Sequence, residues 1–173
     1  MKNLFKILII FTFASNVYAQ NPTPKKGEYR KDDNLDKFAG TWEGSKGNES
    51  LRITLKKEKI YVKGMDFSMD VIIGWHSYTK NGKAIESSIA FAGSSYDENT
   101  TIMASSDGDK KLNFSVFRDL SRERTSSGEL KLINSKEGVL TLRFNEQVLI
   151  NKTPANPTEA IPTPSEWNMK KIE

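Results

Sequence analysis

Hydrophobic and polar residues alternate along much of this chain, which is the pattern of half-buried β-strands. The alternation is clear over residues 51–55, 65–75 and 111–116. Further segments rich in β-branched or aromatic residues are 59–63, 84–91, 100–105, 129–134, 139–145 and the end segment 167–172. Together these patterns predict about eight to ten strands.

The connections between these segments predict antiparallel hairpins. Asn81-Gly82 stands between two strand patterns, and both residues tolerate the positive φ that a two-residue hairpin turn needs. Residues 34–39 are expected to form one helical turn capped by Asn34. No longer helix is predicted after residue 19, so the pattern indicates an all-β barrel or sandwich.

The first nineteen residues have the features of a secretory signal peptide. Lys2 and Lys6 supply the positive charge, residues 7–14 are apolar, and Val17-Tyr18-Ala19 resembles a cleavage site. Gln20 follows, where a lipid anchor would need Cys. A secreted or periplasmic protein without an integral membrane segment is therefore expected.

The remaining chain is expected to be one domain with two irregular segments. Residues 20–34 contain two prolines, seven charged residues and a single aromatic one, Tyr29, and they predict an exposed N-terminal arm. The barrel domain is expected over 35–173, and its proline-rich stretch 153–165 predicts an extended strap.

Charge and composition exclude several classes of protein. Lys plus Arg number 26 against 22 Asp plus Glu, a formal charge of +4 that falls by two without Lys2 and Lys6. So small an excess does not favour nucleic-acid binding. The absence of Cys excludes disulfide scaffolds and thiol enzymes, and with a single His it excludes clustered His/Cys metal centres. No cofactor is expected.

Residues 35–42 (LDKFAGTW) place a helical turn before a Gly-x-Trp motif and a strand, which resembles the opening of lipocalin-like (calycin) barrels. The resemblance implies a single antiparallel up-and-down β-barrel. It also implies that Gly40 and Trp42 form the base of the barrel, where a basic residue from a late strand packs across the indole. By position, that residue is Arg143.

The whole layout is similar to a family of small, functionally uncharacterised secreted proteins common in Bacteroidota. The shared features are the signal peptide, the 35–42 opening, a Tyr-x-Lys-Asn-Gly hairpin at 78–82 and a proline-containing tail at 154–164. Because that family has no established activity, the resemblance implies a fold and a location but no chemistry.

One apolar row stands out as a candidate binding surface: Met65, Phe67, Met69, Val71, Ile73 and Trp75. Two thioethers and two aromatic rings would make an adaptable wall for a hydrophobic ligand. The alternative is that the same row belongs to a filled core, because small barrels are either hollow or filled.

His76 is the single histidine, and it falls on the opposite face of the strand from this row. It is a candidate general base, but a catalytic triad also needs a nucleophile and an acid, and no Gly-x-Ser-x-Gly motif is present. A solvent-facing histidine is therefore expected. Asp107 and Asp109 flank Gly108 in what is expected to be an ordinary turn rather than a calcium loop.

The leading hypothesis is a secreted, monomeric, non-enzymatic lipocalin-like protein that binds a small hydrophobic or amphipathic ligand. The alternative is a protein-binding or envelope-structural module with a filled core, whose partner pairs with an edge strand or the proline-rich tail. A secreted hydrolase is a third hypothesis. Interior volume separates the first two, since a ligand site needs about 300 Å³ or more.

Overall fold

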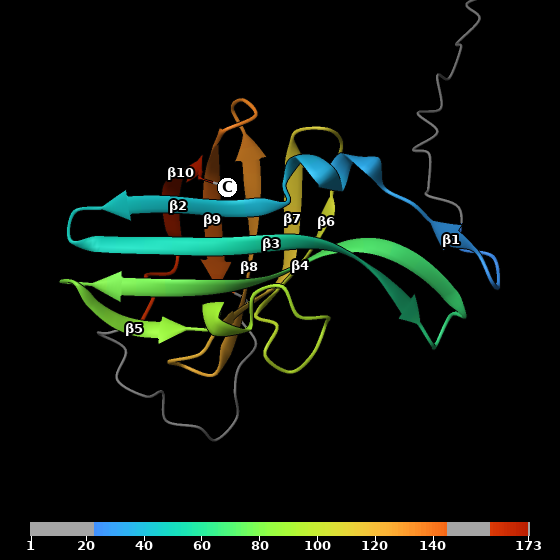
Figure 1. Cartoon of the computed structure of the whole chain (residues 1–173), viewed down its shortest axis with the longest axis horizontal. Coiled ribbons are helices and arrows are strands. Elements are labelled where there is room, and N and C mark those ends of the chain that lie inside the picture. Colours follow the sequence, from blue (N-terminus) through green and yellow to red (C-terminus); the bar gives the residue numbers. More distant parts are fainter. Residues whose placement is uncertain (1–22, 145–159, 173) are drawn as a thin grey trace, which may run out of the picture.

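The structure is a computed structural model that describes residues 23–144 and 160–172. Within these ranges the chain forms ten strands and two short 3₁₀ helices (Figure 1). The elements are β1 (Tyr29–Arg30), η1 (Asp33–Lys37), β2 (Gly40–Lys46), β3 (Glu49–Val62), β4 (Phe67–Lys80), β5 (Lys83–Ser87), η2 (Ile89–Phe91), β6 (Ile102–Ser106), β7 (Lys111–Asp119), β8 (Arg124–Leu132), β9 (Glu137–Phe144) and β10 (Ser165–Lys171).

Eight of these strands close into an antiparallel barrel. Strands that follow one another in sequence pair from β2 to β4 and from β6 to β10, while β10 pairs with β2 and β4 with β6. The remaining two lie outside the barrel, β1 parallel to β4 and β5 antiparallel to it. The predicted all-β antiparallel barrel is confirmed. Among the described residues, no helix is long and apolar enough to span a membrane.

Local sequence signals account for the turns. Asn81 and Gly82 have φ values of 53° and 74°, as the predicted hairpin between β4 and β5 requires. The predicted helical turn is η1, but its cap is Asp32 rather than Asn34: the Asp32 carboxylate accepts a hydrogen bond from the Asn34 N–H. The cap therefore lies two residues earlier than expected.

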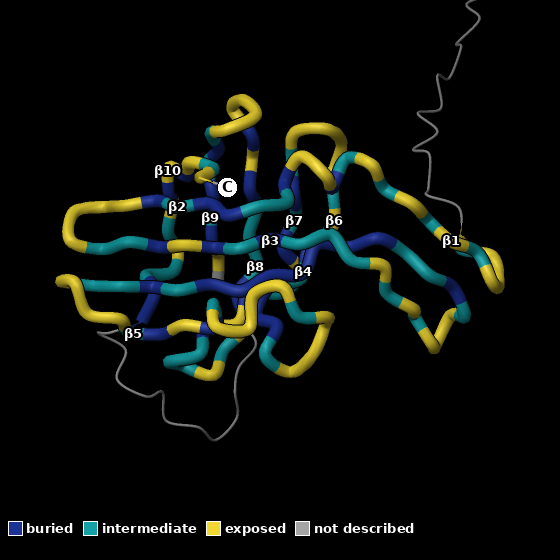
Figure 2. The backbone as a smooth tube through the Cα atoms, viewed as in Figure 1, coloured by how far each residue is buried: buried dark blue, intermediate teal, exposed yellow. Residues whose placement is uncertain are grey.

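The core lies inside the barrel, where the buried positions of the strands converge (Figure 2). Trp42, Tyr78, Phe117 and Trp167 are among its largest fully buried side chains. Leu35 from η1, together with Phe38, joins this cluster and covers one end of the barrel, here called the η1 end. The turns between β6 and β7 and between β8 and β9 lie at the same end (Figure 1).

Both faces of β4 are buried, and this overturns part of the sequence interpretation. Register with β3 places Ile53 opposite His76 and Leu51 opposite Tyr78, and Leu51, Ile53 and Tyr78 belong to the barrel core. Because neighbouring strand residues face opposite ways, Trp75 lies on the outer face.

The outer residues of β4 form a separate cluster, here called the outer apolar cluster: Val71, Ile73, Trp75, with Ile60, Met69 and Ile89 packed against them. The segment after η2 is tied over the outside of β3, where the Lys56 ammonium donates to the Gly93 and Ser94 carbonyls. The prediction that this row lines the barrel interior is therefore wrong. These side chains lie on the outside of the barrel, where Ile89 of η2, Ile60 and Met69 pack against them.

The hairpin of β3 and β4 extends beyond the barrel (Figure 1). The pairing of β2 with β3 ends at Gly40 and Leu55, whereas β3 and β4 stay paired as far as Val62 and Phe67. Within the predicted 20–34 arm, Tyr29 belongs to β1 and donates its hydroxyl to Asp70 at 2.7 Å. The strap 153–165 is described only from residue 160 onward.

Candidate functional site

A surface pocket of about 360 Å³ lies at the η1 end of the barrel. We call it the lysine pocket, after the three lysines among its lining residues. It is lined by Lys37, Asp109, Lys110, Leu132, Ile133, Asn134, Ser135 and Lys171. Leu132 is buried, but Ile133 leaves 65% of its surface exposed. Apolar surface and ammonium groups thus share one concavity.

Backbone hydrogen bonds join the separate elements that build this pocket. The Leu132 N–H donates to the Lys110 carbonyl at 2.8 Å, which links β8 to the β6–β7 turn. The Lys171 N–H donates to the Lys136 carbonyl at 2.8 Å, which links the end of β10 to the β8–β9 turn. The pocket walls are therefore held in place by the barrel rather than by one loop.

Lys171 is the most enclosed of the three lysines. Its ammonium lies 5.6 Å from the centroid of the Trp42 ring and donates to the Lys37 carbonyl at 3.2 Å. Burial lowers the pKa of Lys171 from its ordinary value. The indole N–H of Trp42 donates to the Phe38 carbonyl at 2.9 Å, so this aromatic floor is fixed in orientation.

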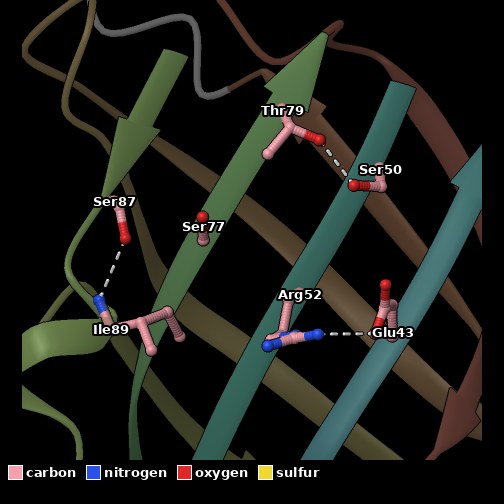
Figure 3. Close-up of a pocket in the computed structure, with 7 residues that line it drawn as sticks. All are labelled: Glu43, Ser50, Arg52, Ser77, Thr79, Ser87 and Ile89. Atoms are coloured by element: carbon pink, nitrogen blue, oxygen red, sulfur yellow. Dashed lines mark hydrogen bonds and ion pairs between the residues drawn. The ribbon is translucent and has the colours of Figure 1, made fainter. Parts of the chain in front are cut away.

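A second pocket, of about 310 Å³, lies on the outer side of β2, β3, β4 and β5 (Figure 3). Its polar side chains largely satisfy one another: Arg52 pairs with Glu43 at 3.0 Å, and the Ser50 and Thr79 hydroxyls lie 2.6 Å apart. Because its cation and its anion are paired together, this outer pocket presents no uncompensated charge to a ligand.

A buried polar network lies inside the barrel, around His76. The ring Nε2 lies 2.8 Å from a Glu86 carboxylate oxygen, and Nδ1 lies 2.9 Å from the Thr101 hydroxyl. Ser88 hydrogen bonds with Thr101 at 3.0 Å, and the Ser121 N–H donates to Glu86 at 2.7 Å. The network continues to Asp119, which pairs with Arg122 near the β7–β8 turn.

The electrostatics of this network are uneven. Burial opposes ionisation of Glu86, but the hydrogen bond and charge of His76 and the bonds from Ser121 outweigh it and lower the pKa of Glu86. Burial, together with the Glu86 charge, raises the pKa of Asp119. The hydroxyl–imidazole–carboxylate chain resembles a proton relay, but Thr101 and His76 are both fully buried. A substrate needs direct reach to such groups.

The model of a family of unknown function, DUF6705, matches residues 1–171. The chain belongs to this family. No curated protein and no solved structure matches it. Membership of DUF6705 agrees with the expected likeness to a functionally uncharacterised family, and it assigns no chemistry.

In this DUF6705 chain, the predicted base motif is only partly placed as expected. Trp42 is fully buried in the core, and Gly40, with φ of 123°, begins β2. The basic residue over the indole is Lys171, not Arg143. Arg143 instead faces outward and pairs with Glu129 at 3.3 Å, because Leu140 and Leu142 occupy the inward positions of β9.

The predicted ligand-binding row is divided among three places. Val71, Ile73 and Trp75, with Met69 packed against them, lie in the outer apolar cluster. Phe67 is buried beneath the Arg30 guanidinium, which lies 5.8 Å from its ring centroid. Met65 lies in the turn between β3 and β4 and is exposed. These residues line neither the lysine pocket nor the outer pocket.

Sequence reasoning missed two features of this family member. His76 was expected to face solvent, but it is fully buried, because Glu86 and Thr101 satisfy both ring nitrogens. The register of the β3–β4 hairpin was the signal available: it places His76 opposite inward-facing Ile53. The lysine pocket was also missed, because its residues come from four separated segments. Among the described residues, no group of three or more His, Cys, Asp or Glu side chains is placed to hold a metal ion.

Proposed function

We propose that this protein is a secreted, non-enzymatic binding protein that holds a small amphipathic molecule in the lysine pocket. The observation that carries the proposal is the meeting of exposed apolar surface, from Ile133, with three ammonium groups in one concavity of about 360 Å³. Ligand sites of small molecules combine apolar lining with a few polar groups at about this size.

Binding at the barrel surface fits the packing better than binding inside. Large core side chains such as Trp42, Tyr78 and Trp167 occupy the interior. Secretion is supported by the signal-like residues 1–19. A non-enzymatic role is supported by the burial of the hydroxyl groups that contact His76, since buried Thr101 and Ser88 offer a substrate no direct approach.

The test is an NMR titration of the full chain without residues 1–19, using octanol and octanoate as probes. We expect shifts of the backbone amides of the lysine pocket with at least one probe. Ile133→Ser should weaken this binding by about threefold to tenfold, since it removes most of an exposed aliphatic side chain. Met65→Ser is the matched control, because Met65 is similarly exposed but lies in the β3–β4 turn and does not line the pocket. If neither probe shifts these amides, the proposed function is wrong.

A second candidate function is supported by the edge of β3. Beyond Leu55, β3 pairs with β4 on one side, and no described strand pairs with its other side. Such an edge is a template for strand addition by a protein partner. In the same titration, this function predicts that the amide signals of the lysine pocket do not shift. When envelope extract is added instead of the probes, it predicts broadening of amide signals confined to residues 56–62.

A further inference from the structure

The three lysines of the pocket share one electrostatic feature. Some cations elsewhere pair with acids, and Lys80 with Glu49, Lys111 with Asp107 and Arg52 with Glu43 are examples. Over the residues that the structure describes, none of Lys37, Lys110 and Lys171 has a carboxylate within ion-pair distance. The pocket therefore holds positive charge that the protein itself does not neutralise.

The contacts that these ammonium groups do make are with neutral carbonyl oxygens. Lys171 donates to the Lys37 carbonyl at 3.2 Å, and Lys37 donates to the Asp109 carbonyl at 3.3 Å. Asp109 is the single carboxylate among the lining residues, against three ammonium groups. One negative charge against three positive charges gives the concavity an excess of two positive charges.

Partial desolvation of Lys171 sharpens this imbalance. The ammonium is half-buried over the Trp42 ring, and burial lowers the pKa of Lys171 without an acidic group to offset it. Taking a cation out of water is unfavourable unless an opposite charge compensates it. An anion entering the pocket would supply that compensation and would form charge-assisted hydrogen bonds.

We infer that the ligand is a small carboxylate with an apolar chain, its head group bound by Lys37, Lys110 and Lys171 and its chain lying on Ile133 and Leu132. The inference rests on the proposed function and adds the sign and position of the ligand's charge. A neutral amphiphile would use the apolar surface alone. A cationic one would be repelled.

Three probes of similar chain length test the charge: octanoate, octanol and octylammonium, each titrated into the same protein and followed by pocket amide shifts. We expect octanoate to bind about tenfold or more tightly than octanol, and octylammonium not to bind. Raising the sodium chloride concentration should weaken octanoate binding and leave octanol binding unchanged, because salt screens exposed charges.

Lys110→Gln tests the position of the head group. Lys110 is exposed, and its side chain makes no hydrogen bond or ion pair with the part of the chain that the structure describes, so the variant should fold with an unchanged melting temperature. Its octanoate affinity should fall about threefold, the size typical of one exposed charge pair, while octanol affinity stays the same. Lys63→Gln, at an exposed lysine beside the β3–β4 turn, is the matched control and should change neither.

The outcomes separate the inference from the proposed function. Equal binding of octanol and octanoate leaves the proposed function intact and overturns the inference. No binding of any probe overturns both. Acetate binding as tightly as octanoate overturns the role of the apolar surface. If the protein sediments with anionic phospholipid vesicles but binds no monomeric octanoate, the surface recognises a membrane and the inference is wrong.

Discussion

Asp119 and Glu86 show how one buried network gives two carboxyl groups opposite properties. Glu86 receives hydrogen bonds from Ser121 and lies against His76, and its pKa is lowered. Burial and the charge of Glu86 raise the pKa of Asp119, although the Arg122 guanidinium is beside it. Stability should therefore depend on pH through two contributions of opposite sign.

The raised pKa of Asp119 predicts the behaviour of Asp119→Asn. A folded-state pKa above the unfolded value contributes stability below the ordinary Asp pKa of about 3.9, and this contribution is lost as pH rises through the folded value. Asn does not titrate, so Asp119→Asn does not lose this stability as pH rises. Relative to the parent, the variant's free energy of unfolding should therefore improve as pH rises from about 4 to about 7. Urea denaturation at several pH values measures it.

Asp107→Asn is the matched control with the opposite sign. Hydrogen bonds from Lys111 and Asn113 lower the pKa of Asp107, so its contribution is present above the ordinary value and is lost as pH falls. This variant should lose stability relative to the parent as pH rises. A difference between Asp119→Asn and the parent that does not change with pH would show that the buried network does not raise the Asp119 pKa.

At the scale of elements, β4 is the strand that joins the parts of the molecule. It pairs with β3 along its whole length, with β5 near its end and with β6 at Ile72, Ile73 and Gly74. Gly74 lies between Leu55 of β3 and Ile102 of β6. A Cβ atom there would lie 2.6 Å from the Thr54 carbonyl oxygen and 2.8 Å from Leu55 Cδ2. Glycine is required for this close approach.

Gly74→Ala should therefore destabilise the barrel. Forcing a methyl group against backbone and a packed side chain is expected to lower the free energy of unfolding by about 1 to 3 kcal/mol. Gly64→Ala is the matched control, because a Cβ at Gly64 meets nothing within 4 Å. Chemical denaturation of both variants measures the difference. Equal stability of the two would mean that the β3, β4 and β6 junction has room for a side chain.

The same strand shows what sequence can and cannot predict here. Period-two patterns and the Asn81-Gly82 turn were sufficient for the strands and the all-β class, and the resemblance of residues 35–42 to lipocalin-like barrels decided between a barrel and a sandwich. They did not show which residues of β4 face the barrel interior, because Ile73 and Trp75 on the outer face are also large and apolar, like inward-facing Ile72 and Tyr78. What decides the face is η2, a covering segment whose position depends on tertiary contacts.

The candidate site was predictable only in part, for a related reason. Alternation along β10 puts Lys171 on the same face as Trp167 and Met169, so a cation near the Trp42 ring could be predicted from the sequence. The lysine pocket as a whole was not. Lys37, Lys110 and Ile133 meet only because the barrel closes, and no spacing between them in the sequence encodes that meeting.

At the scale of the whole molecule, β10 completes the barrel. It lies between β2 and β9, the first and the last but one of the barrel strands in the chain. Its side chains Trp167 and Met169 are buried in the core. Without β10, the two neighbouring strands would each expose an unpaired edge.

A chain that ends at residue 159 should therefore fail to fold cooperatively. We expect loss of the near-UV circular dichroism signal and of a sharp thermal transition, since removing Trp167 alone from a core is worth about 3 to 5 kcal/mol. A synthetic peptide of residues 160–173 should restore both signals when it is added. A sharp transition in the truncated chain without peptide would show that seven strands suffice.

The pairing of β2 with β10 also sets the order of events during synthesis. Of the eight barrel strands, the one that completes the hydrogen bonds of β2 is made last, more than a hundred residues after its partner residue Trp42. Until β10 is made, β2 and β9 each have an unpaired edge. Holding such a chain apart from its neighbours, by a chaperone or by prompt export, protects it during the interval in which aggregation competes with closure.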